Sequence, residues 1–379
     1  MIIILEPDAN KEQVLEKIEK YLDNFPKVQL KVVELEGKTR KVTELHLIGP
    51  THEIRQDILS AIPGVERVIK ISAKYRQIGR DDVDLVPVGF TYKGLRFDQN
   101  SLHIFAGPCA VDTKENVEAT FKMLKGLGIH TARGGAYKPR TSPYDFQGHG
   151  ASCLPWVFEL AGKYDIKVIA MEVLRESHIE EIQKALDEAG HPTGVMLQIG
   201  TRNAQNFELL KEVGSQKELP VLYKRGMGLT LEESLNACEY IASGGNRNII
   251  FCLRGVKSQL GLPHRNIVDF AHVPVIHRLT RLPVCVDPSH SIGSKDASPD
   301  GLMDIFHAAA QGVIAGANMI LVETHPEPET ALCDGPQSLT FKEFEWFLKD
   351  INVVREAYNF RKDTFARNVM KDMTVQEAA

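Results

Sequence analysis

The feature that most constrains this chain is an alternation, repeated eight times after residue 102, of a short apolar run and a helical stretch. The runs include LHIFAGP (102–108), KVIAMEV (167–173) and MILVETHPE (319–327), and helical stretches such as HIEEIQKALDEAG (178–190) end in Gly. This alternation predicts βα units around a parallel sheet. Eight units within about 250 residues are the size of a (β/α)₈ barrel. A doubly wound sheet is the alternative, but no dinucleotide-type glycine fingerprint follows the first strand.

The first 76 residues follow a different order, of strand, helix, two strands, helix and strand. MIIIL (1–5) reads as the first strand, and KEQVLEKIEKYLDNF (11–25) places its apolar residues on one helical face. This βαββαβ order predicts a small α+β ferredoxin-like domain over residues 1–76. The same fold occurs in RNA-recognition domains, but here 13 Lys and Arg balance 12 Asp and Glu, and the strands lack stacking aromatics. We therefore expect a sensor or assembly domain, with a simple packing module as the alternative.

Two segments lie outside these domains. Residues 77–101 are rich in turn residues and contain a short hairpin around VGFTYKGL, which predicts a linker. The barrel is expected over 102–358. The last stretch, 359–379, is polar and charged without clear apolar periodicity, and we expect a C-terminal tail that is disordered or faces a partner.

The charge balance limits the partners of the chain. Fifty acidic against 45 basic residues give a net charge of −5, so nothing favours nucleic acid or an anionic membrane surface. The opening MIIILEPDAN has too short an apolar run for a signal peptide or a membrane anchor. Six cysteines without a CxxC pair fit reduced thiols, which predicts a cytoplasmic protein. Because the net charge is negative, any anion-binding site must depend on a local cluster of basic residues.

Residues that carry chemistry follow the predicted strands, where the active sites of such barrels are built. One set offers a thiol, an imidazole and two carboxylates, a mixture that suits a divalent transition metal such as Mn, Fe, Co or Zn. These four residues are Cys109, His290, Glu323 and Asp334. Singly, each has a plainer explanation, such as a buried cysteine or a hydrogen-bonded core histidine. Their coincidence at one rim favours a metal site.

A second set at the same strand ends is cationic. Its members are Arg133, Lys138, Arg140, Arg202, Lys224 and Arg254. A solvated surface charge is the plain alternative for any one of them, but YKRG (223–226) and CLRG (252–255) put charge directly after strand residues. Six cations around one mouth predict two phosphorylated substrates, or one plus a carboxylate. The glycines and prolines of RGGAYKPRTSP (133–143) let the backbone turn closely around such a ligand.

Several motifs occur in the order of a whole barrel: AGPC, RGGAYKPRTSPYDFQG, QIGTRNAQN, YKRG, DPSH and VETHPEPETALCDGPQSL. Together they resemble the 3-deoxy-7-phosphoheptulonate (DAHP) synthases of the type I beta subgroup. KPRTSP is the specific element, because the sister octulosonate 8-phosphate synthases are expected to carry a KANRSS-like stretch there. The resemblance implies a metal-dependent aldol-type condensation of phosphoenolpyruvate with erythrose 4-phosphate. The products are DAHP and phosphate, in the first step of the shikimate pathway.

The same resemblance implies a role for each site residue. The metal ligands would be Cys109, His290, Glu323 and Asp334. Phosphoenolpyruvate would be held by Arg133, Lys138, Arg202, Lys224 and Arg254, and the aldose phosphate by Arg140, Thr141 and Ser142. Lys138 is the candidate proton donor to the new alkoxide, with His290 or a water in addition. Glu172 is expected to position the attacking water.

The resemblance extends to partners. The N-terminal block is similar to a regulatory domain that binds an aromatic amino acid as feedback inhibitor, and the family is commonly tetrameric, which implies a homo-oligomer. One alternative is a related synthase that uses another aldose phosphate. The other is a catalytically lapsed barrel that senses ligands for a shikimate-pathway enzyme such as chorismate mutase. Leu253 supports the lapsed barrel, because beta-subgroup members usually read CERG where this chain reads CLRG, but the complete metal-ligand set argues against it.

Overall fold

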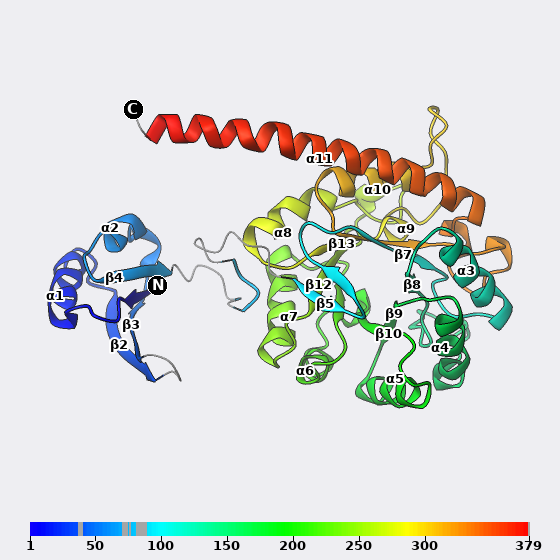
Figure 1. Cartoon of the computed structure of the whole chain (residues 1–379), viewed down its shortest axis with the longest axis horizontal. Helices are drawn as coiled ribbons and strands as arrows, with labels where there is room; N and C mark the ends of the chain where they lie inside the picture. The colour runs from blue at the N-terminus through cyan, green and yellow to red at the C-terminus, as the bar shows by residue number, and fades with distance from the viewer. Residues whose placement is uncertain (37–40, 70–74, 76, 81–88, 378–379) are drawn as a thin grey trace. The chain divides into compact units, whose positions relative to one another are not determined.

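The computed structural model describes residues 1–36, 41–69, 75, 77–80 and 89–377. The chain divides into two compact units, Met1–Arg76 and Gln77–Ala379 (Figure 1). In the part of the chain that is described, no helix is both long and apolar enough to cross a lipid bilayer.

The first unit is an antiparallel four-stranded sheet in the order β2-β3-β1-β4 with two α-helices. Its elements are β1 (Ile2–Leu5), α1 (Lys11–Leu22), β2 (Gln29–Glu36), β3 (Lys41–Ile48), η1 (Thr51–Glu53), α2 (Gln56–Ser60) and β4 (Val65–Ile69). Helix α1 begins where the Asn10 side chain accepts the backbone N–H of Gln13. The buried face of α1, including Ile18, packs on Ile3 and Leu45 of the sheet. This arrangement confirms the predicted ferredoxin-like domain.

The second unit contains eight parallel strands, β7 to β14, that close into a barrel. The strands are β7 (His103–Gly107), β8 (Thr131–Arg133), β9 (Val168–Val173), β10 (Gly194–Ile199), β11 (Val221–Lys224), β12 (Ile249–Leu253), β13 (Val284–Val286) and β14 (Met319–Glu323). The α-helices are α3 (Lys114–Gly126), α4 (Leu154–Lys163), α5 (Glu176–Glu188), α6 (Phe207–Ser215), α7 (Leu231–Ser243), α8 (Val273–Leu279), α9 (Pro288–Ile292), α10 (Asp304–Ile314) and α11 (Phe341–Glu377). Strands such as β10 and β12 are buried at every residue, which is why they read as unbroken apolar runs. The predicted (β/α)₈ barrel is confirmed.

A hairpin closes the N-terminal end of the barrel, called the floor from here on. Its strands are β5 (Phe90–Tyr92) and β6 (Leu95–Phe97). Phe97 is almost fully buried, with its ring centroid 6.2 Å from that of Phe105 in β7. The Tyr92 hydroxyl accepts a hydrogen bond from the backbone N–H of Val195, at the start of β10. The hairpin therefore seals the floor with aromatic side chains.

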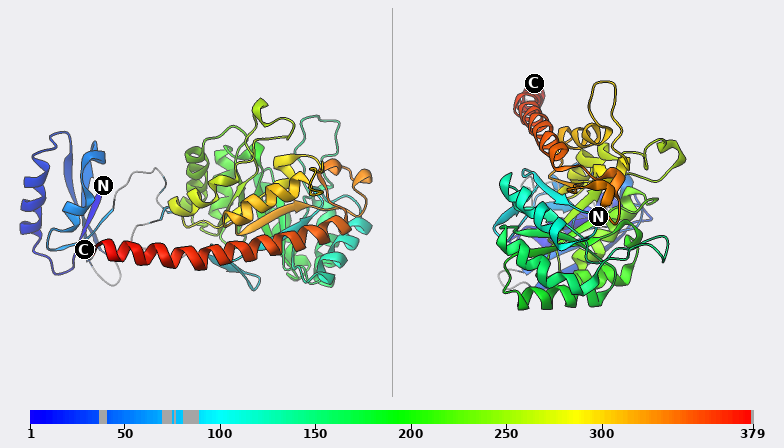
Figure 2. Two further views of the ribbon diagram at one scale, coloured as in Figure 1. Left: turned by 90° about the horizontal axis from the view of Figure 1, so that it is seen from above. Right: turned by 90° about the vertical axis from the view of Figure 1, so that its right-hand side faces the viewer.

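The C-terminal segment is helical through Glu377, which contradicts the disordered alternative predicted for residues 359–379, whereas the partner-facing alternative stays a prediction. Residues 359–377 continue α11, which packs along α10 (Figure 2). The start of α11 is fixed on the barrel by buried Phe344, Phe347 and Ile351. The polar residues that follow include neither Gly nor Pro, so nothing in the chain ends a helix that packing has already nucleated. The lack of apolar periodicity in residues 359–377 therefore did not exclude a helix there.

Candidate active site

The C-terminal ends of the barrel strands form the end opposite the floor, called the rim from here on. Arg133, Lys224 and Glu323 are the last residues of β8, β11 and β14, and Arg254 directly follows β12. Parallel pairing keeps these strand ends level, because the register of neighbouring strands is fixed by their hydrogen bonds. Side chains far apart in sequence therefore meet at one rim.

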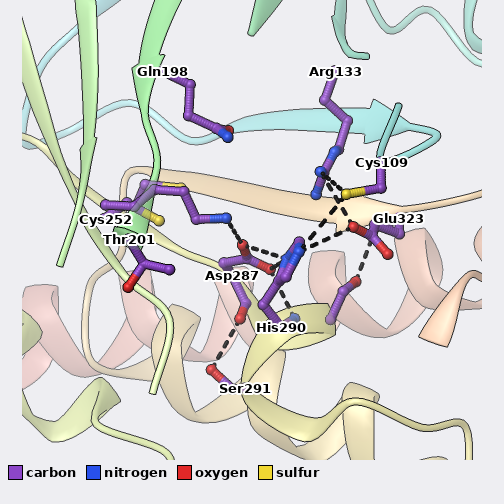
Figure 3. A network of polar contacts seen from close by, with 12 residues as sticks. Cys109, Arg133, Gln198, Thr201, Cys252, Asp287, His290, Ser291 and Glu323 are labelled. Atoms are coloured by element: carbon purple, nitrogen blue, oxygen red, sulfur yellow. Dashed lines mark hydrogen bonds and ion pairs between the residues drawn. The ribbon is translucent and has the colours of Figure 1, made fainter. Parts of the chain in front are cut away.

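Cys109, His290, Glu323 and Asp334 form one cluster at the rim, in which a ligand atom of each lies within 4.8 Å of the others. His290 Nε2 lies 3.8 Å from the Cys109 sulfur and 3.4 Å from Glu323 Oε1. Figure 3 shows these three side chains pointing toward one another. The mixture of sulfur, nitrogen and oxygen atoms fits a divalent transition metal.

His290 is oriented by Asp287, which caps the short helix α9. One carboxylate oxygen of Asp287 accepts the backbone N–H of His290 at 3.0 Å, and the other lies 2.9 Å from the ring Nδ1. The ring therefore directs Nε2 toward Cys109. Burial lowers the pKa of His290 well below its usual value, and this effect exceeds the rise caused by Asp287. The ring is neutral near pH 7, which is the form that binds metals.

Glu323 is fully buried and uses its two oxygens differently. Oε2 accepts a hydrogen bond from the Gln337 side chain at 2.7 Å, whereas Oε1 lies 3.2 Å from Arg133 Nη2. Among the described residues, Oε1 accepts no hydrogen bond. Burial raises the pKa of Glu323 well above its usual value, and Cys109 adds to the rise. Oε1 lies beside the Arg133 guanidinium without accepting a hydrogen bond from it, so this oxygen keeps its lone pairs for a further partner and fits a divalent ion as a ligand.

Lys138 contacts two members of the cluster. Its Nζ hydrogen-bonds to the Cys109 sulfur and lies 2.7 Å from Asp334 Oδ2. Burial alone would lower the pKa of Lys138, but Cys109 and Asp334 raise it, so the amine stays protonated. Burial likewise would raise the pKa of Asp334, but Lys138 and His290 hold it well below its usual range. The ammonium group is therefore fixed beside the cluster.

A strongly charged pocket opens beside the cluster. Its cationic lining residues are Lys138, Arg140, Arg202, Lys224, Arg254 and Arg265, and its acidic ones are Asp145, Glu172 and Asp334. Arg254 is only 2% exposed, and in the described part of the chain its Nε and Nη1 have no hydrogen-bond partner. A buried guanidinium with free donors is suited to a phosphate or carboxylate ligand.

Comparison with known proteins gives the family. The model of the DAHP synthetase I family matches residues 86–358, and that of the DAHP synthase ferredoxin-like domain matches residues 1–73. The chain belongs to the DAHP synthetase I family. This result confirms the predicted family, and with it the predicted class of enzyme.

Individual relatives agree with this membership of the DAHP synthetase I family. The phospho-2-dehydro-3-deoxyheptonate aldolase of Thermotoga maritima is 36% identical over 94% of this chain and 98% of its own length. The crystal structure of a T. maritima DAHP synthase has a TM-score of 0.68 and 34% identity, and the match covers 94% of this chain and 97% of that one. A 2-dehydro-3-deoxyphosphooctonate aldolase of Bradyrhizobium diazoefficiens is 26% identical over 65% of this chain and 87% of its own.

The remaining cationic residues of this DAHP synthetase site lie in different surroundings. Arg133 belongs to the cluster, with Nη2 3.3 Å from the Cys109 sulfur. Arg202 donates a hydrogen bond of 3.4 Å to Thr141, and both line the pocket. Arg140 Nη2 lies 3.1 Å from Asp145. Ser142 is not among the described lining residues. Most of the predicted set thus meets at the pocket mouth, with Arg133 deeper.

Glu172, at the end of β9, also lines the pocket. Its Oε2 accepts a hydrogen bond of 3.2 Å from the Gln198 side chain. Burial raises the pKa of Glu172, although Lys138, Lys224 and other nearby cations oppose the rise. Gly200 lies against this carboxylate, because a Cβ at position 200 would stand 1.8 Å from Glu172 Oε1. The position of Glu172 therefore depends on a glycine at 200.

Sequence reasoning missed three residues of the DAHP synthetase site, namely Asp287, Gln337 and Arg265. Asp287 had a signal, because an Asp before a proline and three residues before His290 is typical of a helix cap. Gln337 lies three residues after Asp334 in the VETHPEPETALCDGPQSL motif, but an amide side chain there gave no sign of its role. Arg265 lies in an irregular segment with no periodic pattern, so nothing in the sequence linked it to the rim.

Proposed function

We propose that this chain condenses phosphoenolpyruvate with erythrose 4-phosphate to form DAHP and phosphate. In this proposal Cys109, His290, Glu323 and Asp334 hold a divalent metal, for which Mn, Fe, Co and Zn all suit the mixed ligand set. The observation that carries the proposal is the buried Glu323 Oε1, which accepts no hydrogen bond from the described residues and faces the other three groups. Membership of the family supports the reaction.

The cations divide between the two substrates. Phosphoenolpyruvate is held by Arg133, Lys138, Arg202, Lys224 and Arg254, and the aldose phosphate by Arg140, Thr141 and Ser142. The free donors of Arg254 support an anion at its end of the pocket. The Arg140 guanidinium forms an ion pair with Asp145. In this proposal the aldose phosphate replaces Asp145 as the partner of Arg140.

The reaction joins C3 of phosphoenolpyruvate to the aldehyde carbon. A metal bound at the cluster would polarise the aldehyde carbonyl. Lys138, kept protonated by Cys109 and Asp334, donates a proton to the alkoxide oxygen. A water is the second candidate donor, because the His290 ring is neutral and directs Nε2 toward the cluster. Glu172 orients the water that adds to C2, after which the C2–O bond breaks and phosphate leaves with the bonding electrons. Product formation thus consumes one water and releases one phosphate.

A phosphate-release assay tests this function. With phosphoenolpyruvate and erythrose 4-phosphate, one phosphate is expected per DAHP formed, and dialysis against a chelator should abolish turnover until Mn²⁺ or Co²⁺ is restored. An aldopentose 5-phosphate serves as the competing substrate and should turn over at least about 100-fold less efficiently, on the scale of recognition by hydrogen bonding. Turnover that ignores the chelator, or that prefers the aldopentose, would contradict the proposal.

We also propose that residues 1–76 sense an aromatic amino acid, tyrosine or phenylalanine, that inhibits the barrel. Support comes from the match of this region to the DAHP synthase ferredoxin-like domain. The solved structure of a truncated form of the T. maritima synthase has a TM-score of 0.63 and 35% identity, and the match covers 74% of this chain and 96% of that one. Removing residues 1–76 should preserve turnover and abolish inhibition by these amino acids. If neither amino acid inhibits the intact protein, the remaining role for the domain is assembly. The homotetramer and the association with chorismate mutase stay predictions.

A further inference from the structure

Gln337 connects the metal-site carboxylate Glu323 to the pocket wall. It lies in the short turn Gly335–Gln337 and is 2% exposed. Its Nε2 donates to Glu323 Oε2 at 2.7 Å, and its Oε1 accepts from Arg265 Nη1 at 3.2 Å. Because arginine can only donate, its contact places the amide oxygen of Gln337 toward Arg265 and leaves the amide NH₂ toward Glu323.

The consequence for Glu323 is that its oxygens cannot exchange roles. Oε2 is held by Gln337, so Oε1 is the oxygen that faces His290 Nε2 at 3.4 Å. The other neighbour of Oε1 is the Arg133 guanidinium, and no described residue donates a hydrogen bond to it. A single carboxylate oxygen is thereby directed into the cluster.

Arg265 reaches the second carboxylate of the cluster as well. Its Nη1 lies 3.8 Å from Asp334 Oδ1, and its side chain is 40% exposed at the pocket wall. One arginine therefore contacts Asp334 directly and Glu323 through Gln337. The positions of both carboxylates in the cluster therefore depend on the same guanidinium group.

We propose that Gln337, oriented by Arg265, is a positioning residue that presents only Oε1 of Glu323 to the divalent ion. This inference rests on the proposed metal site. Groups that hydrogen-bond to metal ligands commonly set affinity, and losing one costs about 10- to 100-fold. Without the amide donor, Glu323 gains rotational freedom and Oε2 becomes a buried acceptor with no donor.

The chain offers a matched control at the same rim. Gln198 is 5% exposed and donates to one oxygen of a buried glutamate, Glu172, at 3.2 Å. Neither of these two residues belongs to the cluster, and Gln198 lies apart from it in Figure 3. Gln337→Met and Gln198→Met therefore remove the same kind of hydrogen bond from two neighbouring glutamates, of which only one is a proposed ligand.

The experiment is a titration of Co²⁺ alone into metal-free, full-length protein. Readouts are the Kd by competition with a chromophoric chelator, the thiolate-to-cobalt absorption band, and the thermal midpoint of the metal-free form. Gln337→Met should weaken Co²⁺ about 10- to 100-fold and shift the band, whereas Gln198→Met should stay within about threefold of wild type. Wild-type affinity and an unchanged band in Gln337→Met would overturn the inference.

Two further outcomes separate this inference from the function on which it depends. If the wild-type protein shows no cobalt band, the metal site itself is wrong. If Gln337→Met does not fold, Arg265→Met replaces it, because that side chain is partly exposed. Arg265→Met should weaken Co²⁺ by about 5- to 20-fold, through the loss of both its contacts, and unchanged affinity there would overturn the inference.

Discussion

The two ends of the barrel are built from the same strands but treat buried polar groups in opposite ways. At the floor, the buried side chain of Asn318 is fully used: His277 Nε2 lies 2.8 Å from its Oδ1, which also accepts the backbone N–H of Val284. At the rim, Arg254 and Glu323 are buried with polar atoms that have no hydrogen-bond partner among the described residues. Buried polar atoms without hydrogen bonds are costly to a fold, so their presence at the rim marks the end that meets ligands. Substitutions at the rim should therefore change activity, and those at the floor stability.

The largest effect is expected from Cys109→Ala at the rim. Losing the thiolate ligand should lower kcat by about 10⁴-fold, equivalent to about 5 kcal/mol, because the bound ion supplies charge stabilisation worth several kcal/mol. The free energy of unfolding should change by less than about 1 kcal/mol, since no large packing contact is lost. Steady-state kinetics and urea unfolding measure the two quantities. If Cys109→Ala kept a tenth of the wild-type kcat, the proposal that rim substitutions act mainly on activity would be contradicted.

The reverse pattern is expected from Phe97→Ala at the floor. Removing this almost fully buried ring should cost about 4 kcal/mol of stability, through lost contacts and a cavity. The kcat of the folded protein should stay within about twofold, because the side chain lies at the far end of the strands. Phe360→Ala is the control, since Phe360 is 68% exposed and should change stability by less than about 0.5 kcal/mol. A tenfold fall in kcat for Phe97→Ala would mean that the ends are coupled.

The floor also predicts a pH effect. Burial lowers the pKa of His277 from 6.5 to about 4. Between these two pH values, His277 is protonated in the unfolded chain but neutral in the folded chain. The resulting stability is present above pH 6.5 and is lost as the pH falls, amounting to about 3 kcal/mol between pH 7 and 4. His277→Gln keeps an N–H donor for Asn318 but cannot titrate. The two proteins should therefore have similar stability near pH 7, and urea unfolding should show the wild type falling below His277→Gln as the pH drops toward 4. Parallel curves would refute the assignment.

The smallest effect is expected from Arg254→Lys. Lysine keeps the charge but loses the two-pronged guanidinium, so KM for phosphoenolpyruvate should rise about tenfold, or about 1.4 kcal/mol, with a smaller change in kcat. Arg278→Lys is the matched control, because Arg278 is exposed on α8 at the floor. Equal kinetics for the two variants would remove Arg254 from the anion site.

Much of the fold was readable because parallel strands buried on both faces appear as unbroken apolar runs. The ligand cluster was readable because strand ends in a barrel share one rim, so Glu323 and Cys109 could be brought together without a three-dimensional structure. Gln337 and Arg265 could not be found this way, since their contact depends on the path of two irregular loops. The extent of α11 was hidden because its continuation carries no apolar stripe.

The close approach of Gly200 to Glu172 has a consequence for anyone who diversifies this enzyme. Even alanine at 200 would place a carbon atom 1.8 Å from Glu172 Oε1, so the Glu172 carboxylate, proposed to orient the attacking water, would be displaced. The four cluster residues lie on or after other strands, whereas Arg202 lies two residues after Gly200 in the same loop. A single methyl group at this position should therefore disturb Glu172 first and leave the four cluster residues in place.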